Sequence, residues 1–250
     1  GPDGHSEPVR LRSLVGLLPL IAVAHAPDWI TRELPDFVAR LRWLQRRRPD
    51  LTDALVTTRA EGQVVTSLAP LTAARAQALM TRLFDEGEFL GPHGIRSLSA
   101  AYRGGVTLDV AGVSMSVAYD PGESTTNLFG GNSNWRGPVW FPINVLLIDG
   151  LRGHARAAGG SAEVEYPTGS GRTRGLGEVA DDLEQRLVSL FRPGADGRRP
   201  GTPRDHPSGP LWDVHVTFAE YFDGDTGRGC GASHQTGWTA LVAHLICARP

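Results

Sequence analysis

The chain has 250 residues, of which 40% are hydrophobic and 21% are charged, and its formal net charge is −2. This composition is ordinary for a globular protein, and the small net charge gives no electrostatic case for a nucleic acid or an anionic membrane as partner. All 25 residues in the Lys+Arg count are arginines. Schiff-base lysine chemistry and a Walker-type phosphate lysine are therefore excluded. The lysine-free composition also favours a GC-rich bacterial genome.

The cysteines set a second limit on the chemistry. Only Cys230 and Cys247 are present, which is too few for a disulfide framework. Their spacing to His234 and His244 is not that of a zinc knuckle. We therefore expect no metal and no other cofactor, and two unpaired cysteines favour a cytoplasmic location.

The amino-terminal part has some features of a secretory leader. Arg10 and Arg12 precede an apolar run over residues 14–21. Pro19 interrupts this run, which is also shorter than the roughly 20 residues that a membrane-spanning helix needs. We expect a buried helix over residues 11–24 and no membrane partner.

Apolar periodicity predicts a mainly helical fold. The chain also contains 31 glycines and 18 prolines, so long loops must connect the helices. The pattern is clearest where leucine and valine recur on one face and acidic residues on the other. Beyond the first helix, five segments have helical spacing: 34–48, 72–84, 138–157, 175–191 and 237–247.

One segment has the alternation of strands. Apolar residues alternate over 106–110 and 113–119 on either side of an Ala-Gly pair, which predicts a β-hairpin. Residues 192–210 are rich in proline, glycine and arginine and predict a long surface loop. We expect one partial domain over residues 1–250, with a ragged start over 1–8. Helices joined by long polar loops are typical of an α/α toroid or a bundle, with the hairpin as an insertion.

Residues 130–144 combine two indoles, a guanidinium and several amides in a loop that leads into a helix. An indole stacks on the C–H face of a pyranose, and Arg and Asn side chains reach its hydroxyls. Trp140 and Asn144 lie one helical turn apart and share a face. An unpaired buried amide costs about 1–3 kcal/mol, so Asn144 needs a ligand, a pocket water or a local partner in the core. With Trp135 and Arg136 upstream, we expect a carbohydrate pocket.

A second group of polar and aromatic residues lies near the C-terminus. Glu220 lies between aromatic residues, where desolvation favours a protonated carboxyl and suits it to proton transfer. The alternative is a solvated Glu at the end of an element. His234, Gln235 and Trp238 add donors and a further sugar-sized platform. The Asp-Gly-Asp-Thr-Gly run over 223–227 resembles an ion-binding turn, but we expect a plain turn.

Five segments carry a family resemblance: 9–20, 94–98, 130–144, 166–170 and 231–241. The runs Asn-Trp-Arg-Gly-Pro-Val-Trp and Gly-Ala-Ser-His-Gln-Thr-Gly-Trp-Thr are the most specific. Together they resemble the C-terminal part of the catalytic domain of glycoside hydrolase family 63, in its bacterial branch of mannosylglycerate- or glucosylglycerate-type hydrolases and glucosidases. The resemblance implies an (α/α)6 barrel and inverting hydrolysis of an α-glycosidic bond by two carboxyl groups.

The resemblance also implies roles for single residues. Glu220 matches the general base, Trp135, Arg136 and Trp140 match residues that line the glycone subsite, and Trp238 is similar to a pocket-lining position. The general acid of the family is an aspartate that lies upstream of everything present here. We therefore expect a partial (α/α)6 barrel that is inactive alone. Its partners would be an α-glycoside substrate and the missing N-terminal half of the barrel.

Two other functions stay open on the same fold. A carbohydrate-binding or degenerate partner module would keep the tryptophans and the arginine without turnover. A sugar epimerase or isomerase would use pairs of histidines, for which His93, His215 and His234 are available, although none lies in a paired motif. Hydrolysis releases new reducing ends and epimerisation does not. Nucleic-acid binding is disfavoured because the arginines are dispersed among acidic residues.

Overall fold

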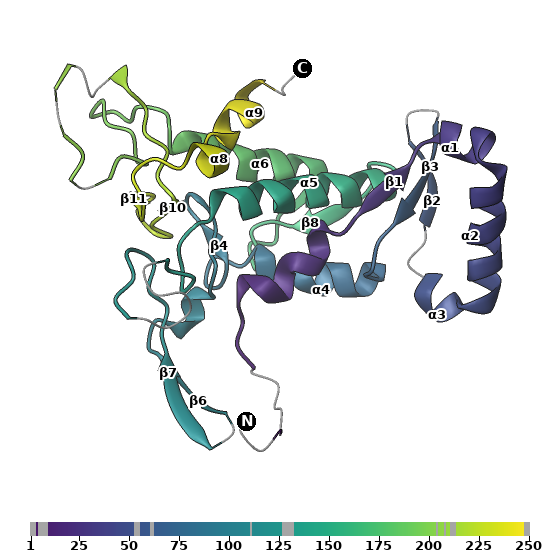
Figure 1. Ribbon diagram of the computed structural model, residues 1–250, viewed down its shortest axis with the longest axis horizontal. Helices are drawn as coiled ribbons and strands as arrows, with labels where there is room; N and C mark the ends of the chain where they lie inside the picture. The colour runs from purple at the N-terminus through teal and green to yellow at the C-terminus, as the bar shows by residue number, and fades with distance from the viewer. Residues whose placement is uncertain are drawn as a thin grey trace. The chain divides into compact units, whose positions relative to one another are not determined.

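The computed structural model describes residues 4, 10–52, 56–60, 63–110, 112–126, 133–203, 205–207, 209–210 and 214–247. This part of the chain is mainly helical with short strands, as the sequence predicts (Figure 1). The predicted ragged start lies outside the described residues, apart from residue 4. Two compact units are present: unit 1 comprises Gly1–Gly16, Asp85–Val145 and Leu183–Pro250, and unit 2 comprises Leu17–Phe84 and Leu146–Asp182.

Three helices run through the division between the units: η1 (Leu14–Ile21), α5 (Phe141–Ala157) and α6 (Leu176–Ser189). Unit 2 also contains β1 (Ala24–Ala26), α1 (Asp28–Glu33), α2 (Pro35–Arg47), α3 (Pro49–Thr52), β2 (Val56–Ala60), β3 (Gln63–Leu68), α4 (Ala73–Leu83), β8 (Glu163–Glu165) and β9 (Thr173–Gly175). Unit 1 also contains β4 (Leu90–Gly91), β5 (Gly94–Ile95), η2 (Ala100–Tyr102), β6 (Val106–Val110), β7 (Val113–Val117), β10 (Tyr221–Phe222), β11 (Gly229–Cys230), α8 (Thr236–Thr239) and α9 (Leu241–Cys247).

The first predicted helix is a 3₁₀-helix instead of an α-helix. Its buried side chains are Leu14, Leu17 and Leu20, which are spaced by three residues. A 3₁₀-helix has three residues per turn, so this spacing places all three leucines on one buried face. The predicted buried helix is present over 14–21, but it is shorter than the predicted range 11–24 and has 3₁₀ geometry.

Other helices follow the predicted periodicity closely. In α4 the hydroxyl of Thr72 caps the N-terminus by accepting from the Arg75 N–H, and Ala76, Met80 and Leu83 are buried. Helix α6 lies inside the predicted segment 175–191. The last predicted helix, over 237–247, is divided into α8 and α9, which Ala240 separates.

The strands form small antiparallel sheets. Strands β6 and β7 pair as the predicted hairpin, with Val106 opposite Val117. The sheet with the order β1-β3-β2 in unit 2 was not predicted. The remaining sheets have two strands each: β4-β5, β8-β9 and β10-β11.

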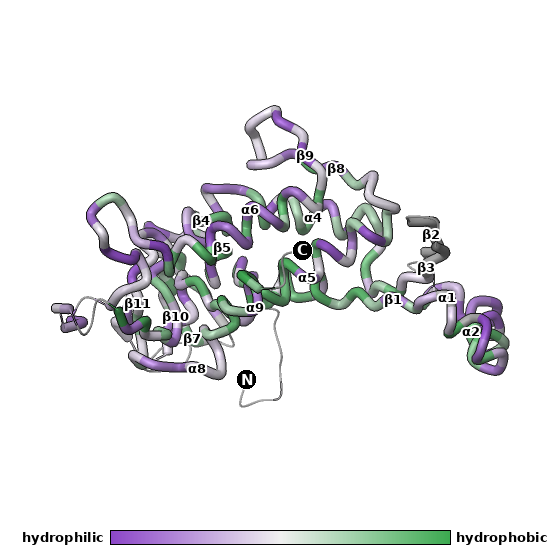
Figure 2. The backbone as a smooth tube through the Cα atoms, turned by 90° about the horizontal axis from the view of Figure 1, so that it is seen from above, coloured by the Kyte–Doolittle hydropathy of each residue, from purple (hydrophilic) through white to green (hydrophobic). Residues whose placement is uncertain are grey.

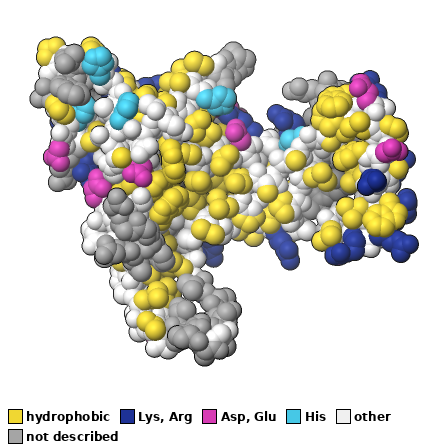
Figure 3. Space-filling view, viewed as in Figure 1, with side chains coloured by type: hydrophobic (Ala, Val, Ile, Leu, Met, Phe, Trp, Pro, Cys, Tyr) yellow, Lys and Arg dark blue, Asp and Glu magenta, His cyan; other side chains and the backbone are white. Residues whose placement is uncertain are grey.

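Helices α1 to α3 carry apolar side chains that face solvent. The sequence predicts that Leu34 and Phe37 point inward from the second helix, but they are 45% and 40% exposed. Figure 3 shows apolar side chains and arginines side by side over this part of unit 2. The helix predicted over 34–48 is therefore confirmed as α2, while Leu34 and Phe37 on its apolar face are exposed. Further exposed apolar residues here are Trp29, Trp43 and Leu51.

The core of unit 2 forms where η1 meets α5. Helix α5 contains both apolar and hydrophilic residues (Figure 2), and its residues Leu147, Ile148 and Leu151 are buried. A Cβ atom at Gly150 would lie 2.5 Å from the Leu20 carbonyl oxygen. The backbone of η1 therefore approaches α5 at a position that only glycine allows. No helix among the described residues has the length and apolar character needed to cross a membrane.

We predict that Gly150→Ala lowers the free energy of unfolding by about 1–3 kcal/mol, because the methyl group would force η1 away from α5. Gly177→Ala in α6 is the matched control, since a Cβ there meets nothing within 4 Å. The control should be neutral or slightly more stable because alanine favours helix. Urea unfolding of both variants measures the difference, and equal stability would contradict the close approach.

Candidate functional site

The loop before α5 is joined to the strand that follows Glu220. The Val139 N–H donates to the Phe222 carbonyl at 2.8 Å, and the Phe222 N–H donates to the Val139 carbonyl at 3.0 Å. This pairing explains why α5 begins at Phe141 and not at Pro138, since the backbone at Val139 is extended. It also brings together the two groups of candidate residues, which are about eighty positions apart in the sequence. Residues 127–132 lie outside the described part of the chain.

A stack of aromatic rings forms the centre of the site. Trp140 is 1% exposed, and its indole N–H donates to the Asn134 carbonyl at 2.9 Å. The ring of Trp135 lies parallel to it, with 4.0 Å between centroids. Tyr221 and Trp238 contact Trp140 at centroid distances of 4.8 and 5.6 Å. The structure thus brings together all three predicted tryptophans of the site.

The three tryptophans differ in their access to solvent. Trp135 is half-buried and Trp238 is 39% exposed, whereas Trp140 is enclosed between its neighbours. A sugar needs an open ring face to stack on. Trp135 and Trp238 are therefore the candidate platforms for a sugar, and the enclosed ring of Trp140 packs against both of them.

Arg136 and Asn134 hold the loop together from inside. The guanidinium of Arg136 is buried and donates to Asp120 Oδ2 at 2.8 Å and to Thr125 Oγ1 at 3.2 Å. Asn134 is fully buried, and its amide donates to the carbonyl oxygens of Asp120 and Gly122. Both side chains fix residues 133–136 against residues 120–125. Arg136 therefore has protein partners at the position where the sequence predicts a sugar contact.

Asn144 has a structural role. Its Oδ1 accepts from the Ile95 N–H at 2.6 Å, and its amide donates to the carbonyl oxygens of Ile95 and Trp140. Of the partners that the sequence left open for this amide, the structure shows local ones, which are the backbones of β5 and α5. A buried amide in this position pins α5 to β5.

The Glu220 carboxylate lies beside the tryptophan loop. Its Oε1 accepts from the Ser133 hydroxyl at 3.2 Å, and its Oε2 accepts from the Ala232 N–H at 3.0 Å. The side chain is half-buried. Ser133 is two residues from Trp135, so this hydrogen bond joins the carboxylate to the loop that carries the half-buried indole. Sequence reasoning did not identify Ser133, because a single serine in a Gly/Asn-rich loop carries no recognisable pattern.

A second carboxylate, that of Glu123, contacts the residues next to Glu220 and Ala232, and the sequence did not predict it. It accepts from the Tyr221 hydroxyl at 3.1 Å and from the Gly231 N–H at 3.1 and 3.3 Å. Burial, followed by the charge of Glu123, raises the pKa of Tyr221, so this phenol is a protonated donor. No motif surrounds Glu123, and only the contact with β10 identifies it.

His234 and Gln235 lie at the start of α8. The imidazole of His234 packs against the ring of Phe218, with 5.5 Å between centroids, and is otherwise exposed. Gln235 is half-buried, and its backbone N–H donates to the Phe218 carbonyl at 2.6 Å. Both residues therefore contact Phe218, which lies two residues before Glu220 in the chain.

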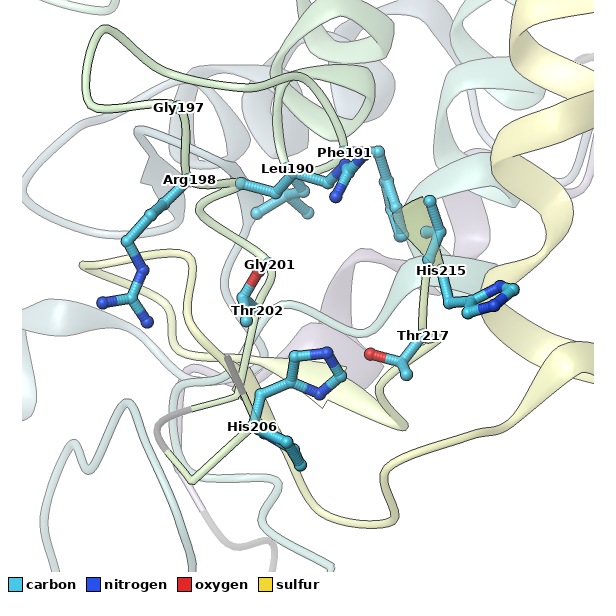
Figure 4. A pocket seen from close by; sticks show the side chains of 12 residues that line it. Leu190, Phe191, Gly197, Arg198, Gly201, Thr202, His206, His215 and Thr217 are labelled. Atoms are coloured by element: carbon cyan, nitrogen blue, oxygen red, sulfur yellow. The ribbon is translucent and has the colours of Figure 1, made fainter. Parts of the chain in front are cut away.

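Unit 1 also has a separate cavity of about 230 Å³ beneath the loop 192–203 (Figure 4). Its lining includes His206, His215 and Thr217, but none of the predicted sugar-site residues. Of the other histidines considered, His93 lies against Gly227, and burial lowers its pKa. Among the described residues, no cluster of three or more His, Cys, Asp or Glu side chains is placed to hold a metal ion.

The run 223–227 is a plain turn tied to a charged network. Asp223 Oδ1 accepts from the backbone N–H groups of Asp225 and Thr226. Asp225 Oδ1 accepts from Arg103 at 2.9 Å, from Tyr119 at 2.9 Å and from Arg96 at 3.3 Å. The turn between β10 and β11 is therefore tied through Asp225 to Arg96 and Arg103.

Burial by itself would raise the pKa of Asp225, but its hydrogen bonds and the two arginine charges outweigh this effect and lower the pKa below the ordinary value. A lowered carboxyl pKa stabilises the fold above the unfolded pKa, and this stabilisation is lost as the pH falls through the folded pKa.

We predict that Asp225→Asn lowers the free energy of unfolding by about 1–3 kcal/mol at pH 7 and that the deficit narrows below about pH 4. Urea midpoints from pH 7 to pH 3 measure the deficit. Asp109→Asn, at an exposed carboxylate on β6, is the control and should show no such pH dependence. A deficit that is constant with pH would contradict the ion-pair explanation.

Comparison with known families agrees with this geometry. The family model of the mannosylglycerate hydrolase MGH1-like glycoside hydrolase domain matches residues 52–239. The chain belongs to this glycoside hydrolase family. The predicted likeness to glycoside hydrolase family 63 is confirmed, and the match includes every predicted site residue.

Three relatives extend the comparison. The uncharacterized protein YMR196W of Saccharomyces cerevisiae is 43% identical over 97% of this chain and 23% of its own length. The probable mannosyl-oligosaccharide glucosidase of Schizosaccharomyces pombe is 25% identical over 72% of this chain and 16% of its own length. The mannosyl-oligosaccharide glucosidase of Saccharomyces cerevisiae is 27% identical over 47% of this chain and 11% of its own length.

The chain spans less than a quarter of the length of each of these relatives. All three come from yeasts, so they give no support to the predicted bacterial origin.

Proposed function

We propose that this chain carries the general base and part of the sugar-binding surface of an inverting α-glycoside hydrolase, with Glu220 as the base. Its fold is then roughly the C-terminal half of an (α/α)6 barrel, which works within a longer catalytic domain. The observation that carries the proposal is the position of the Glu220 carboxylate, held by Ser133 and the Ala232 N–H beside the half-buried Trp135.

The contacts of Glu220 suit the role of a base. A general base takes a proton from a water molecule that lies within hydrogen-bond reach of it. Each carboxylate oxygen accepts one hydrogen bond from the described residues and has capacity for another. A water molecule bound to Glu220 would then lie beside a sugar stacked on Trp135 or Trp238.

Inverting hydrolysis needs a second group opposite this base. The water oxygen attacks the anomeric carbon as its proton passes to Glu220, and the bond to the leaving oxygen breaks as a general acid protonates that oxygen. We place this acid in a part of the catalytic domain outside residues 1–250. The substrate class is an α-glucoside or α-mannoside, in keeping with the names of the family and of the two glucosidases.

A carbohydrate-binding module without turnover is the second candidate, because the stack of Trp135, Trp140 and Trp238 would bind a sugar even without the base. Calorimetry and product analysis on the same full-length protein separate the two. Binding of an α-glycoside with no release of reducing ends favours the module.

We predict that Glu220→Gln in the full-length protein lowers kcat by on the order of 10²–10⁴-fold with little change in KM, because the amide cannot take the proton from water. Hydrolysis of an α-glucosyl fluoride should fall as well, since fluoride leaves with little help from an acid but water still needs the base. Glu163→Gln, at an exposed position in β8, is the control. Proton NMR should show the β-anomer as first product of the wild type. Retained fluoride hydrolysis in Glu220→Gln would contradict the base role.

We predict that the isolated 250-residue chain does not release reducing ends from alkyl α-glucosides or α-mannosides, because it lacks the proton donor for the leaving oxygen. The measurement is a reducing-end assay on the purified chain beside the full-length protein. Turnover by the isolated chain that Glu220→Gln abolishes would show that the acid lies within these residues.

A further inference from the structure

The turn that follows β11 connects two carboxylates. The Gly231 N–H donates to both oxygens of Glu123, and the next N–H along the chain, that of Ala232, donates to Glu220 Oε2. Adjacent amides of one turn are thus bound by two different glutamates. The backbone N–H of Glu220 in turn donates to the Ala232 carbonyl at 2.9 Å. Any rotation of this turn therefore changes the surroundings of Glu220.

Gly231 makes the turn possible. Its φ angle of 69° lies in the left-handed region, which glycine adopts without strain. A Cβ atom there would lie 2.6 Å from the ring of Tyr221 and 2.7 Å from Glu220 Oε2. The position has no side chain to hold it, so the turn is fixed through its backbone amides.

Glu123 supplies that fixation from a different loop. It is exposed, yet its carboxylate contacts the Gly231 N–H and also the hydroxyl of the fully buried Tyr221. Tyr221 is anchored in the core beside Trp140. The carboxylate therefore links the glycine turn to a side chain that is fully buried.

We propose that Glu123 is a positioning residue for Glu220: by binding the Gly231 N–H and the Tyr221 hydroxyl, it holds the turn whose next amide orients the catalytic carboxylate. This inference rests on the proposed function of Glu220. A residue that acts in this way should affect kcat more than KM, because it contacts the base and not the sugar.

The test uses the full-length protein with Glu123→Ala, Glu123→Asp and the control Ser124→Ala, whose hydroxyl bonds to the Thr126 carbonyl within its own loop. We expect Glu123→Ala to lower kcat at least 10-fold with KM within about 3-fold of the wild type. Glu123→Asp, which keeps the carboxylate, should recover part of the loss, and Ser124→Ala should behave as wild type. A raised KM with unchanged kcat, or unchanged kinetics, would overturn the proposal.

A second measurement does not depend on turnover. Amide hydrogen exchange over residues 229–234 should be at least 10-fold faster in Glu123→Ala than in wild type or Ser124→Ala, because the turn has lost its anchor. Unchanged exchange would overturn the proposal even if kcat falls. An inactive wild-type protein would instead contradict the hydrolase function, and exchange would then decide whether Glu123 holds the turn.

Discussion

The burial of one indole, that of Trp140, organises the candidate site. Its N–H donates to the Asn134 carbonyl, so the loop must curl back over the start of α5. In this conformation the ring of Trp135 stacks parallel to the ring of Trp140, and the ring of Tyr221 packs against Trp140 at a tilt of 31°. Because a buried indole needs both apolar contacts and a partner for its N–H, few other loop conformations satisfy it. The position of the half-buried Trp135 therefore depends on the burial of Trp140.

Polar side chains complete this arrangement from within. Asn134 and Asn144 bond to backbone groups, and Arg136 donates to the side chains of Asp120 and Thr125. Residues that seemed suited to a sugar by type are therefore partners of the protein itself. The groups that stay accessible are fewer: a half-buried carboxylate at Glu220 and two partly open indoles. A small open surface on a rigid frame is what precise positioning of a substrate requires.

The sequence predicted the elements with strong local signals. The amphipathic pattern of α6, the helical spacing of α4 and the alternation of the β6–β7 hairpin are all present in the structure. It failed where a distant contact overrides local preference, as at Val139, whose pairing with Phe222 delays the start of α5. The 3₁₀ geometry of η1 and the sheet β1-β3-β2 likewise depend on packing that no local pattern encodes.

By itself, the sequence determined the family, the mainly helical class and the two groups of residues that form the site, because residue type and short spacing are local properties. Only the tertiary structure decided which side chains in those groups are accessible and which are internal. It also revealed Glu123, which has no motif and is about a hundred residues from the turn it binds. The physical reason is that a hydrogen bond depends on which groups meet in space. A buried polar group such as the Asn144 amide therefore bonds to whichever partner the fold places next to it.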